Sequence, residues 1–550
     1  MKRILYSALI LMLSAMSCSK WLDIKPTTFV SEALIWEDKA LIDQFMANIY
    51  GSMICGFNRE TEGPGTSWAC AFGGNFDSGT DDFDGKYDAS VNQFNTNEIS
   101  AQNTPFAAQI WQTSYQIIRK CNMLIESMPS VAENKINSED KNRYIAEARF
   151  LRAFNYFELA RTFGKAPLIT HAQKMTENLL VKPSSFDELI EFICNECDEC
   201  HEYLYKEVPE ALFGHASQGA FLSLKSRALL YYASPLNNPS NELKRWEEAA
   251  EAADAVRKLG VYELYTQTET PYYSMAFDET ASNKEIIFSR RFLFPEMTNN
   301  IHMQWSFDPA NKDRGSWNGL YPTQNLVDAF ETTDGKLITD PASIYDPQNP
   351  YANRDARFYQ SIVHHLSVWE GDEIRFDLYP PSAVNARCGY GPRKFIEEHI
   401  GPADDLYVGT YAQDNDWPFF RYAEILLNYA EARNEALSAP DIEVYEAVNA
   451  VRTRSGQPEL PSGLGKEEMR ERIRNERRVE LLLEEHRFFD LRRWKLADKL
   501  RETIRGMKVT EKDGTFIYTV SDIEKRYFSE DNWYLPIPQS EQEKNPYLSE

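Results

Sequence analysis

The stretch CNECDECH, residues 194–201, contains the side chains with the most evident chemical potential. It places Cys194, Cys197 and Cys200 three residues apart and ends in Cys-x-x-Cys-His. That spacing attaches c-type haem and is similar to the spacing of thiolate metal sites. Whether these thiols are ligands depends on the element that carries them.

Residues 185–205 predict a helix with an apolar stripe, beginning at a capping box formed by Ser185 and Glu188. The stripe consists of Phe186, Leu189, Ile190, Ile193 and Leu204. At about 100° per residue, Cys197 and Cys200 fall within it. Cys194 and Cys200 are separated by a rise of about 9 Å, too far to bind one zinc. Because free cysteine packs as a small hydrophobic residue, we expect a buried helix face, with haem attachment as the alternative.

Two glutamates in segment 473–494 have the residue type of a glycosidase acid and nucleophile. Glu480 and Glu484 lie on one helical stripe with Arg477 and Arg487, each of which is three residues from one glutamate. Positive neighbours lower the pKa of a carboxyl group, whereas a general acid needs a raised pKa. We therefore expect the ion pairs Arg477–Glu480 and Glu484–Arg487 along one helix, and no catalysis.

The other motifs do not predict an enzyme or a metal site. No G-x-S-x-G, P-loop, H-E-x-x-H or G-x-G-x-x-G motif is present. TDDFDG, residues 80–85, resembles a calcium loop, but Val91 stands where the twelfth-position glutamate belongs. His364 and His365 are adjacent and would point to opposite faces of a strand. We expect no catalytic residue, no metal and no cofactor.

The first residues predict export. MKRILYSALILMLSAMSCSK combines a basic start, a short apolar run and a small residue before Cys18. This pattern resembles the lipobox of bacterial lipoproteins, although Ala15 stands where leucine is usual. We expect a signal peptide over 1–17, a tether over 18–29 with lipid on Cys18, and no other membrane attachment. An ordinary secretory signal is the alternative, and the membrane leaflet stays open.

Charge excludes one class of partner. The formal charge is −25, and removal of residues 1–17 takes away two positive charges, which makes it −27. Such a chain repels nucleic acid and other polyanions, whereas neutral ligands are not excluded. Apolar residues make up 43% of the chain, enough for a large core, and several aromatic residues stand in Gly/Asn/Asp-rich stretches.

The elements that must position any site are helical. Segments 139–163, 219–233 and 417–437 are apolar on several faces, which predicts helices packed between neighbours. Each is followed by a second helical pattern, at 185–205, 244–259 and 442–455, the last ending at Gly456. Repeated helix pairs are typical of tetratricopeptide-like units stacked into a solenoid. Residues 51–105 and 265–415 break this pattern, and loops this long on a helical frame are usually where ligands are held.

Nine stretches spread along the chain carry a combined signal: CSKWLDIKP (18–26), AEARFLRAFNYFELARTFGKAPL (146–168), LKSRALLYYASP (224–235), NKEIIFS (283–289), RDARF (354–358), FRYAEILLNYAEARNEAL (420–437), VNAVRTRSG (448–456), IRNERRVELLLEEHRFFDLRRW (473–494) and YLPIPQSEQEKNPYL (534–548). In this order they resemble the SusD/RagB family of nutrient-binding outer-membrane lipoproteins. The resemblance implies a single, mostly α domain over 30–550, with four tetratricopeptide-like helix pairs in a right-handed solenoid and a loop-rich ligand-binding half. It also implies a SusC-like TonB-dependent transporter as partner, an outer-membrane location and no catalysis.

With catalysis, metal binding and nucleic-acid binding set aside, we expect ligand recognition by shape and by stacking on aromatic rings. Sugars lie on aromatic rings while polar side chains hydrogen-bond their hydroxyls. The loop-rich regions that the resemblance assigns to the ligand contain these predicted ligand-binding residues: Trp68, Trp305, Trp317, Tyr87, Asn75, Arg314 and Asn318. The alternative for each tryptophan is that it fills a local core.

We therefore predict a surface protein that captures an oligosaccharide for its transporter. The alternative is a peptide-binding protein of the RagB type, in which backbone hydrogen bonds would matter more than the tryptophans. A surface hydrolase would need a paired acid and base in the loops, and none is found.

Overall fold

The computed structural model describes residues 32–57, 59, 75–85, 91–278, 280, 282–293, 297–299, 301–306, 319–369, 371–380, 386–398 and 413–549. The long helices are α3 (Lys39–Gly51), α5 (Ala107–Ser127), α6 (Ser138–Phe163), α7 (Phe186–Cys200), α8 (Gln218–Ala233), α9 (Leu243–Leu259), α14 (Tyr422–Ala436), α15 (Ile442–Arg454), α16 (Lys466–Glu480) and α17 (His486–Arg493). The short ones are α2 (Glu32–Ile35), α4 (Asn92–Thr96), α10 (Pro271–Ser274), α11 (Ile301–Trp305), α12 (Gln324–Val327), α13 (Ala356–Ser361), α18 (Ala497–Leu500) and α19 (Gln539–Lys544).

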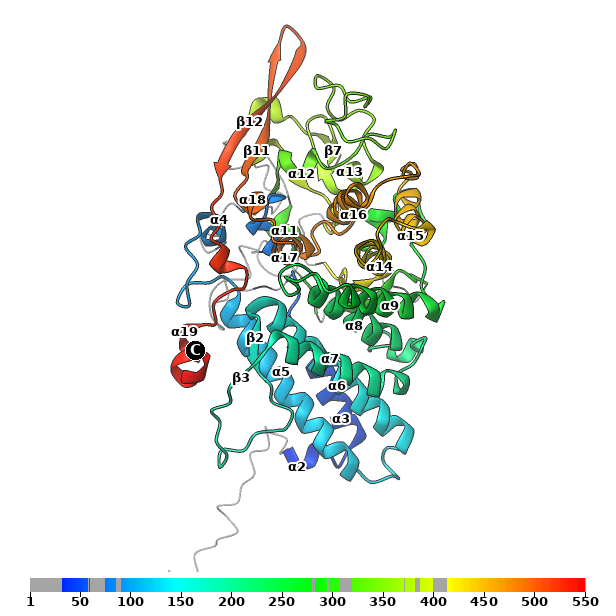
Figure 1. The fold of residues 1–550 in the computed structure, drawn as a ribbon, viewed down its shortest axis with the longest axis vertical. Coiled ribbons are helices and arrows are strands. Elements are labelled where there is room, and N and C mark those ends of the chain that lie inside the picture. Colours follow the sequence, from blue (N-terminus) through cyan, green and yellow to red (C-terminus); the bar gives the residue numbers. More distant parts are fainter. Residues whose placement is uncertain are drawn as a thin grey trace, which may run out of the picture.

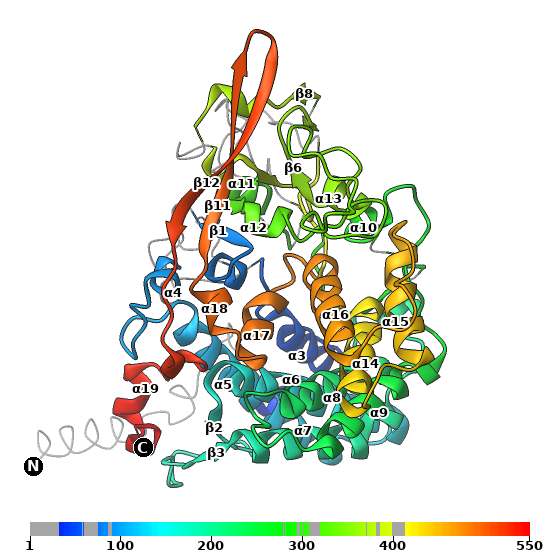
Figure 2. The ribbon, with the colours of Figure 1, turned by 45° about the horizontal axis from the view of Figure 1, so that its top comes forward.

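Helices that pack in chain order form one half of the molecule (Figure 1). α5, α6, α7, α8 and α9 each contact the next, and α9 contacts α14, which contacts α15. Figure 2 shows these helices side by side, with α16 and α17 between them and the loop-rich half. The predicted helical fold is confirmed, while four tetratricopeptide-like units and a right-handed solenoid stay predictions.

Local sequence explains how the central helix begins and ends. At the start of α6, the Asn137 side chain accepts a hydrogen bond from the Asp140 amide at 2.8 Å. The helix ends at Gly164, whose φ of 72° is the left-handed conformation that favours glycine. Most of its side chains between these ends are buried, because α5 and α7 pack on it.

Some of the strand pairs join segments that are distant in sequence, and others are local. Among the described residues, each strand pairs with one antiparallel partner. The pairs are β1 (Phe83–Gly85) with β5 (Leu320–Pro322), β2 (Lys165–Pro167) with β3 (Pro183–Ser185), β4 (Ile286–Arg290) with β10 (Trp417–Arg421), β6 (Ile362–Val363) with β9 (Gly391–Pro392), β7 (Val368–Trp369) with β8 (Asp372–Glu373), and β11 (Thr503–Lys512) with β12 (Thr515–Lys525).

Three features differ from the sequence-based expectations. The predicted helix 417–437 is wrong at its start, because residues 417–421 form β10 and pair with β4. The predicted helix through 473–494 is broken after Glu480, and Leu483 and Glu485 adopt positive φ before α17 begins. The β11–β12 hairpin, which projects from the top of the molecule in Figure 1, was not predicted. Its turn, Asp513-Gly514, is a sequence signal for such a hairpin.

Candidate functional site

The two loop-rich regions meet at the β1–β5 pair. Gly85 lies opposite Leu320 in the register. Beside this pair, the Thr323 amide donates to the Asp82 carbonyl at 2.9 Å, and the Thr323 hydroxyl donates to the Asp81 carbonyl at 2.6 Å. The ends of two segments that are more than two hundred residues apart in the sequence are therefore held together. The two loop-rich regions are thus joined here, while their binding of one ligand stays a prediction.

A buried aromatic cluster supports the same part of the molecule. It is centred on Phe57, whose ring centroid lies 4.9 Å from Trp417, 5.3 Å from Phe395, 5.7 Å from Trp305 and 6.0 Å from Phe292. All five residues are buried. They come from both loop-rich regions and from β10, so their packing holds described segments of the two regions against β10.

The tightness of this cluster is tested at Gly56. A Cβ atom at Gly56 would overlap the Trp417 ring, so Gly56→Ala must displace a buried indole. We expect it to lower the free energy of unfolding by about 1–3 kcal/mol in urea denaturation. Gly51→Ala is the matched control, because no atom lies within 4 Å of its added Cβ. Equal stability of the two variants would show that the cluster is not tightly packed.

Two of the predicted ligand-binding residues are buried. Trp305 has no exposed surface and packs in the aromatic cluster. Asn75 is also fully buried, and its side-chain oxygen accepts the Asp77 amide at 2.7 Å, which caps a short helix. Neither presents a face to solvent, so their assignment as direct ligand contacts is not retained. The structure instead gives both a role in supporting the loops.

The remaining predicted residues, Trp68, Tyr87, Arg314, Trp317 and Asn318, lie outside the described residues, as does Cys18. The structure does describe the residues that border the segments containing them. The stretch 86–90, which contains Tyr87, follows Gly85, and the stretch 307–318, which contains Arg314, Trp317 and Asn318, ends before Gly319, the neighbour of the residue paired with Gly85. The ligand contacts of these five residues stay predictions.

The acidic motif TDDFDG is held by arginines. Asp81 accepts hydrogen bonds from the Arg487 guanidinium at 2.9 and 2.8 Å and from Arg478 at 3.0 Å, and Arg478 also donates to Asp82 at 2.6 Å. Burial acts to raise the pKa of Asp81, but Arg478 and Arg487 hold it below its ordinary value. These carboxylates thus join β1 to α16 and α17.

Glu480 and Glu484 belong to a buried ion network that includes Glu285, Arg357, Lys394, Arg421 and Arg454. The predicted pairs Arg477–Glu480 and Glu484–Arg487 are wrong. Arg477 and Glu480 both lie on α16 but pair with residues of other elements, and Glu484 lies in the turn between α16 and α17. Glu480 accepts from Arg421 at 2.7 Å, and Arg477 pairs with Asp490 at 2.9 Å. Although burial opposes it, the arginines lower the pKa of Glu480, so it cannot serve as a general acid.

The CNECDECH segment lies on α7, and the predicted capping box of Ser185 and Glu188 is confirmed. Cys197 and Cys200 are buried as predicted, and the Cys197 thiol donates to the Phe221 carbonyl at 3.4 Å. Burial raises the pKa of Cys194 to about 12 and that of Cys200 to about 11, and raises the pKa of Cys197 still further. Such thiols stay protonated and are poor ligands.

Thiol reactivity tests this interpretation. We expect the peptide containing residues 194–200 to react with a water-soluble maleimide at least ~100-fold more slowly in the native protein than in guanidinium chloride, because thiolate is scarce and access is blocked. Mass spectrometry of the labelled peptide measures the two rates. Rapid native labelling at Cys197 would contradict a buried helix face.

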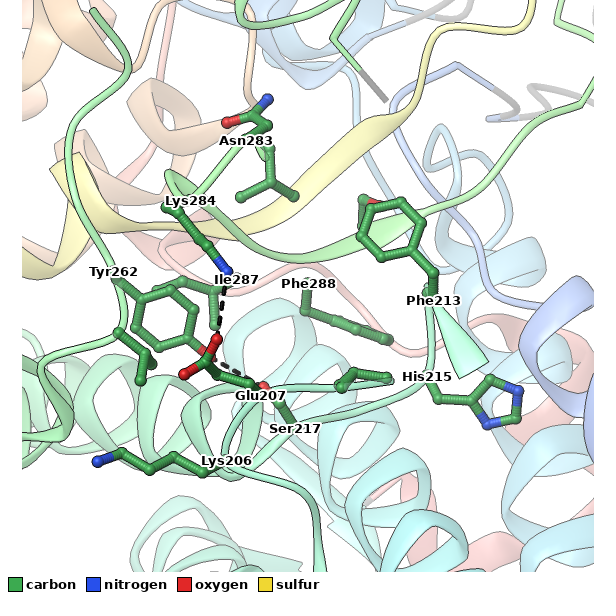
Figure 3. Close-up of a pocket in the computed structure, with 15 residues that line it drawn as sticks. Lys206, Glu207, Phe213, His215, Ser217, Tyr262, Asn283, Lys284, Ile287 and Phe288 are labelled. Carbon is green, nitrogen blue, oxygen red and sulfur yellow. Dashed lines mark hydrogen bonds and ion pairs between the residues drawn. The ribbon is translucent and has the colours of Figure 1, made fainter. Parts of the chain in front are cut away.

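A cavity of about 120 Å³ opens between the α7–α8 connection and β4. Tyr262 lies on one side of it and Phe213 on the other, with Phe288 between them (Figure 3). At its rim the Lys284 ammonium lies 3.4 Å from the Glu207 carboxylate, and the Tyr262 and Ser217 hydroxyls lie 3.0 Å apart. These residues were not predicted as a site. Phe213 beside Gly214, in the connection between two predicted helices, is the sequence signal for this cavity.

Within the part of the chain that the structure describes, no helix combines the length and the apolar composition needed to cross a membrane.

Comparisons with known proteins match both the N-terminal and the C-terminal part of the chain. The model of the SusD family matches residues 284–550, and a model described as "Starch-binding associating with outer membrane" matches residues 20–230. The chain is 26% identical to SusD-like protein P38 of Formosa agariphila over 430 residues, which is 72% of this chain and 74% of that protein.

Solved structures have the same fold. A SusD-like protein of Bacteroides fragilis is 29% identical, with a TM-score of 0.77 over 93% of this chain and 96% of its own. A second protein of that organism, described as a SusD-like carbohydrate-binding protein, is 25% identical, with a TM-score of 0.75 over 94% of this chain and 99% of its own.

Proposed function

Because this chain belongs to the SusD/RagB family, we propose that it captures an oligosaccharide at the bacterial surface and delivers it to a SusC-like TonB-dependent transporter in the outer membrane. As a member of this family it is a binding protein and not an enzyme. The glycan and the outer-membrane location extend to this chain what the names of the matching model and of the carbohydrate-binding relative say of those proteins, and the transporter is what the family resemblance implies.

The observation that carries the proposal is the junction of the two loop-rich regions. The β1–β5 pair and the aromatic cluster hold together the ends of segments that contain Trp68, Tyr87 and Trp317. Aromatic rings with nearby polar side chains are the usual means of binding sugars. A rigid helical half with converging loops suits capture of a ligand without chemical change.

We further propose that lipid on Cys18 attaches the protein to the outer membrane. The matching family model is described as outer-membrane associated, and residues 18–29 would serve as the tether. Protease treatment of intact cells tests surface exposure, since only a surface protein is cleaved while a periplasmic control stays intact. Replacement of Cys18 by Ala should release the protein from the membrane fraction.

A binding screen tests the proposed ligand class. We expect measurable calorimetric affinity for at least one glycan in a broad panel, and none for peptides of mixed sequence. Affinity for peptides with no affinity for any glycan would overturn the carbohydrate proposal and support peptide uptake instead.

A further inference from the structure

The connection between β2 and β3 exposes apolar side chains to solvent. We call this connection, residues 168–182, the β2–β3 loop. Met175 is 91% exposed, and Leu179 and Leu180 are each 44% exposed. Apolar side chains that gather on one exposed segment indicate a contact surface, whereas single exposed ones do not.

Hydrogen bonds hold the loop in this conformation. Near its start the Ala172 amide donates to the Glu126 carboxylate of α5 at 2.8 Å, and near its end the Asn545 side chain donates to the Val181 carbonyl at 2.7 Å. Between them the Glu177 amide donates to the carbonyl three residues earlier at 3.0 Å, which closes a turn that contains the exposed methionine. Because these contacts engage backbone and polar groups, the loop keeps its shape while its apolar side chains stay exposed.

The loop lies at the end of the helical half where the described chain begins. Glu126 belongs to the last turn of α5, beside the connection to α6. The chain that follows α2 attaches to the same connection and to the start of α6, since Glu37 pairs with Lys135 and the Tyr144 hydroxyl donates to Asp43. Figure 1 shows α2 and the β2–β3 loop at the lower end of the molecule.

The proposed lipid on Cys18 would bring this end to the bilayer. Residues 18–31 lie between the lipid and α2, and these 14 residues span no more than about 50 Å even when fully extended. β7 lies near the opposite end of the molecule in Figure 1. The β2–β3 loop is therefore at the end that the lipid restrains most closely.

Charge permits contact with lipid phosphates. Lys174 and Lys182 stand on either side of the three apolar residues, and the loop's only carboxylate, Glu177, pairs with His171 at 2.8 Å. Two lysines and one glutamate give the loop a formal charge of +1, although that of the chain is −25. One arginine and one glutamate of α5 also bond to the loop, and their charges cancel. Lysine side chains can place their ammonium groups among lipid headgroups while apolar neighbours enter the interface.

From these observations we infer that the β2–β3 loop docks on the lipid surface of the membrane, with Met175, Leu179 and Leu180 in the interface and Lys174 and Lys182 at the phosphates. The inference rests on the proposed lipid on Cys18 and adds a second, non-covalent membrane contact. Three partly exposed side chains bind a bilayer too weakly by themselves, so the lipid must bring them there. Their effect is to fix which end of the molecule rests on the lipid.

The test holds the mature chain on vesicles of phosphatidylethanolamine and phosphatidylglycerol through an N-terminal hexahistidine bound to a nickel-chelating lipid. An NBD fluorophore is attached at Met175→Cys, and the labelled unsubstituted chain gives the background from native thiols. We expect aqueous iodide to quench the fluorophore at least about twofold less on vesicles than in solution. Val368→Cys is the matched control, because Val368 is an apolar residue of β7 that is 58% exposed, and its label should be quenched equally in both.

A second pair of variants separates the apolar side chains from the label. Leu179→Ser combined with Leu180→Ser should restore most of the quenching at position 175, because the apolar surface that enters the interface is lost. Ile442→Ser, at a residue of α15 that is 69% exposed, should leave the protection unchanged. Circular dichroism of each variant confirms that the fold is retained.

The outcomes separate this inference from the anchoring proposal. Equal quenching of the labels at positions 175 and 368 on vesicles would overturn the docking of the loop. So would protection at position 175 that occurs in native outer-membrane fragments but not on protein-free vesicles, because the loop would then contact a protein. Mass spectrometry of the chain isolated from cells decides separately whether Cys18 carries lipid; a chain without it would overturn the anchoring proposal, and with it the contact of the loop in the cell.

Discussion

Arg421→Met is expected to lower the free energy of unfolding by about 3–5 kcal/mol. The Arg421 guanidinium is fully buried and donates to Glu285 at 2.7 Å, to Glu480 at 2.7 Å and to Glu484 at 2.8 Å. Its removal leaves carboxylates in a low-dielectric interior with fewer compensating charges. Urea denaturation followed by circular dichroism measures the change.

An exposed ion pair supplies the control for this variant. Lys258 lies 2.7 Å from Asp254 on α9, but its side chain is 77% exposed. Water screens such a pair, so Lys258→Met should leave the urea midpoint unchanged. If Arg421→Met unfolds at the same midpoint as Lys258→Met, the ion network does not hold the two halves of the molecule together.

The same network predicts how stability depends on pH. Although burial opposes it, Arg421 and Lys394 keep the pKa of Glu484 below its ordinary value in the folded protein, and Arg454 and Arg421 do the same for Glu480. A carboxyl group with a lowered folded-state pKa contributes stability above its unfolded-state pKa of about 4.3, and this contribution is lost as the pH falls through the folded-state value. We therefore expect the urea midpoint to fall on acidification below that pH, and to fall less in Arg421→Met.

The second large effect is that replacing different tryptophans should change different properties, glycan affinity in one case and stability in the other. Combined replacement of Trp68 and Trp317 by Ala should weaken glycan binding by at least about 100-fold, because stacking faces are lost, while stability stays unchanged. Trp305→Ala should do the reverse. It removes a fully buried side chain from the aromatic cluster and should cost about 3–5 kcal/mol of unfolding free energy.

Calorimetry and thermal denaturation on the same samples distinguish these results. Trp305→Phe is the conservative control, since it keeps an aromatic ring against Phe57 and should recover most of the stability. Wild-type glycan affinity in the Trp68 and Trp317 double variant would remove the tryptophan loops from the proposed binding site. Unchanged stability of Trp305→Ala would contradict its place in the aromatic cluster.

Much of the helical half is predictable from the sequence because its signals are local. The periodicity that predicts helix 139–163 corresponds to α6 at 138–163, and the patterns at 185–205, 219–233, 244–259 and 442–455 likewise correspond to α7, α8, α9 and α15. The capping box at Ser185 and the buried positions of Cys197 and Cys200 follow from the same short-range spacing. The nine sequence stretches and their order along the chain were also sufficient to recognise the family resemblance.

What only the tertiary structure decided are the long-range pairings. Segment 473–494 has helical spacing throughout, yet the helix ends at Glu480, and Glu480 and Glu484 pair with buried cations from distant parts of the chain. Trp305 and Asn75 have the residue types of ligand contacts, but packing with distant residues buries them. The cavity of Figure 3 likewise combines residues from 206 to 289. Burial and charge pairing depend on which segments meet in space, and residue spacing along one element contains no information about partners hundreds of residues away.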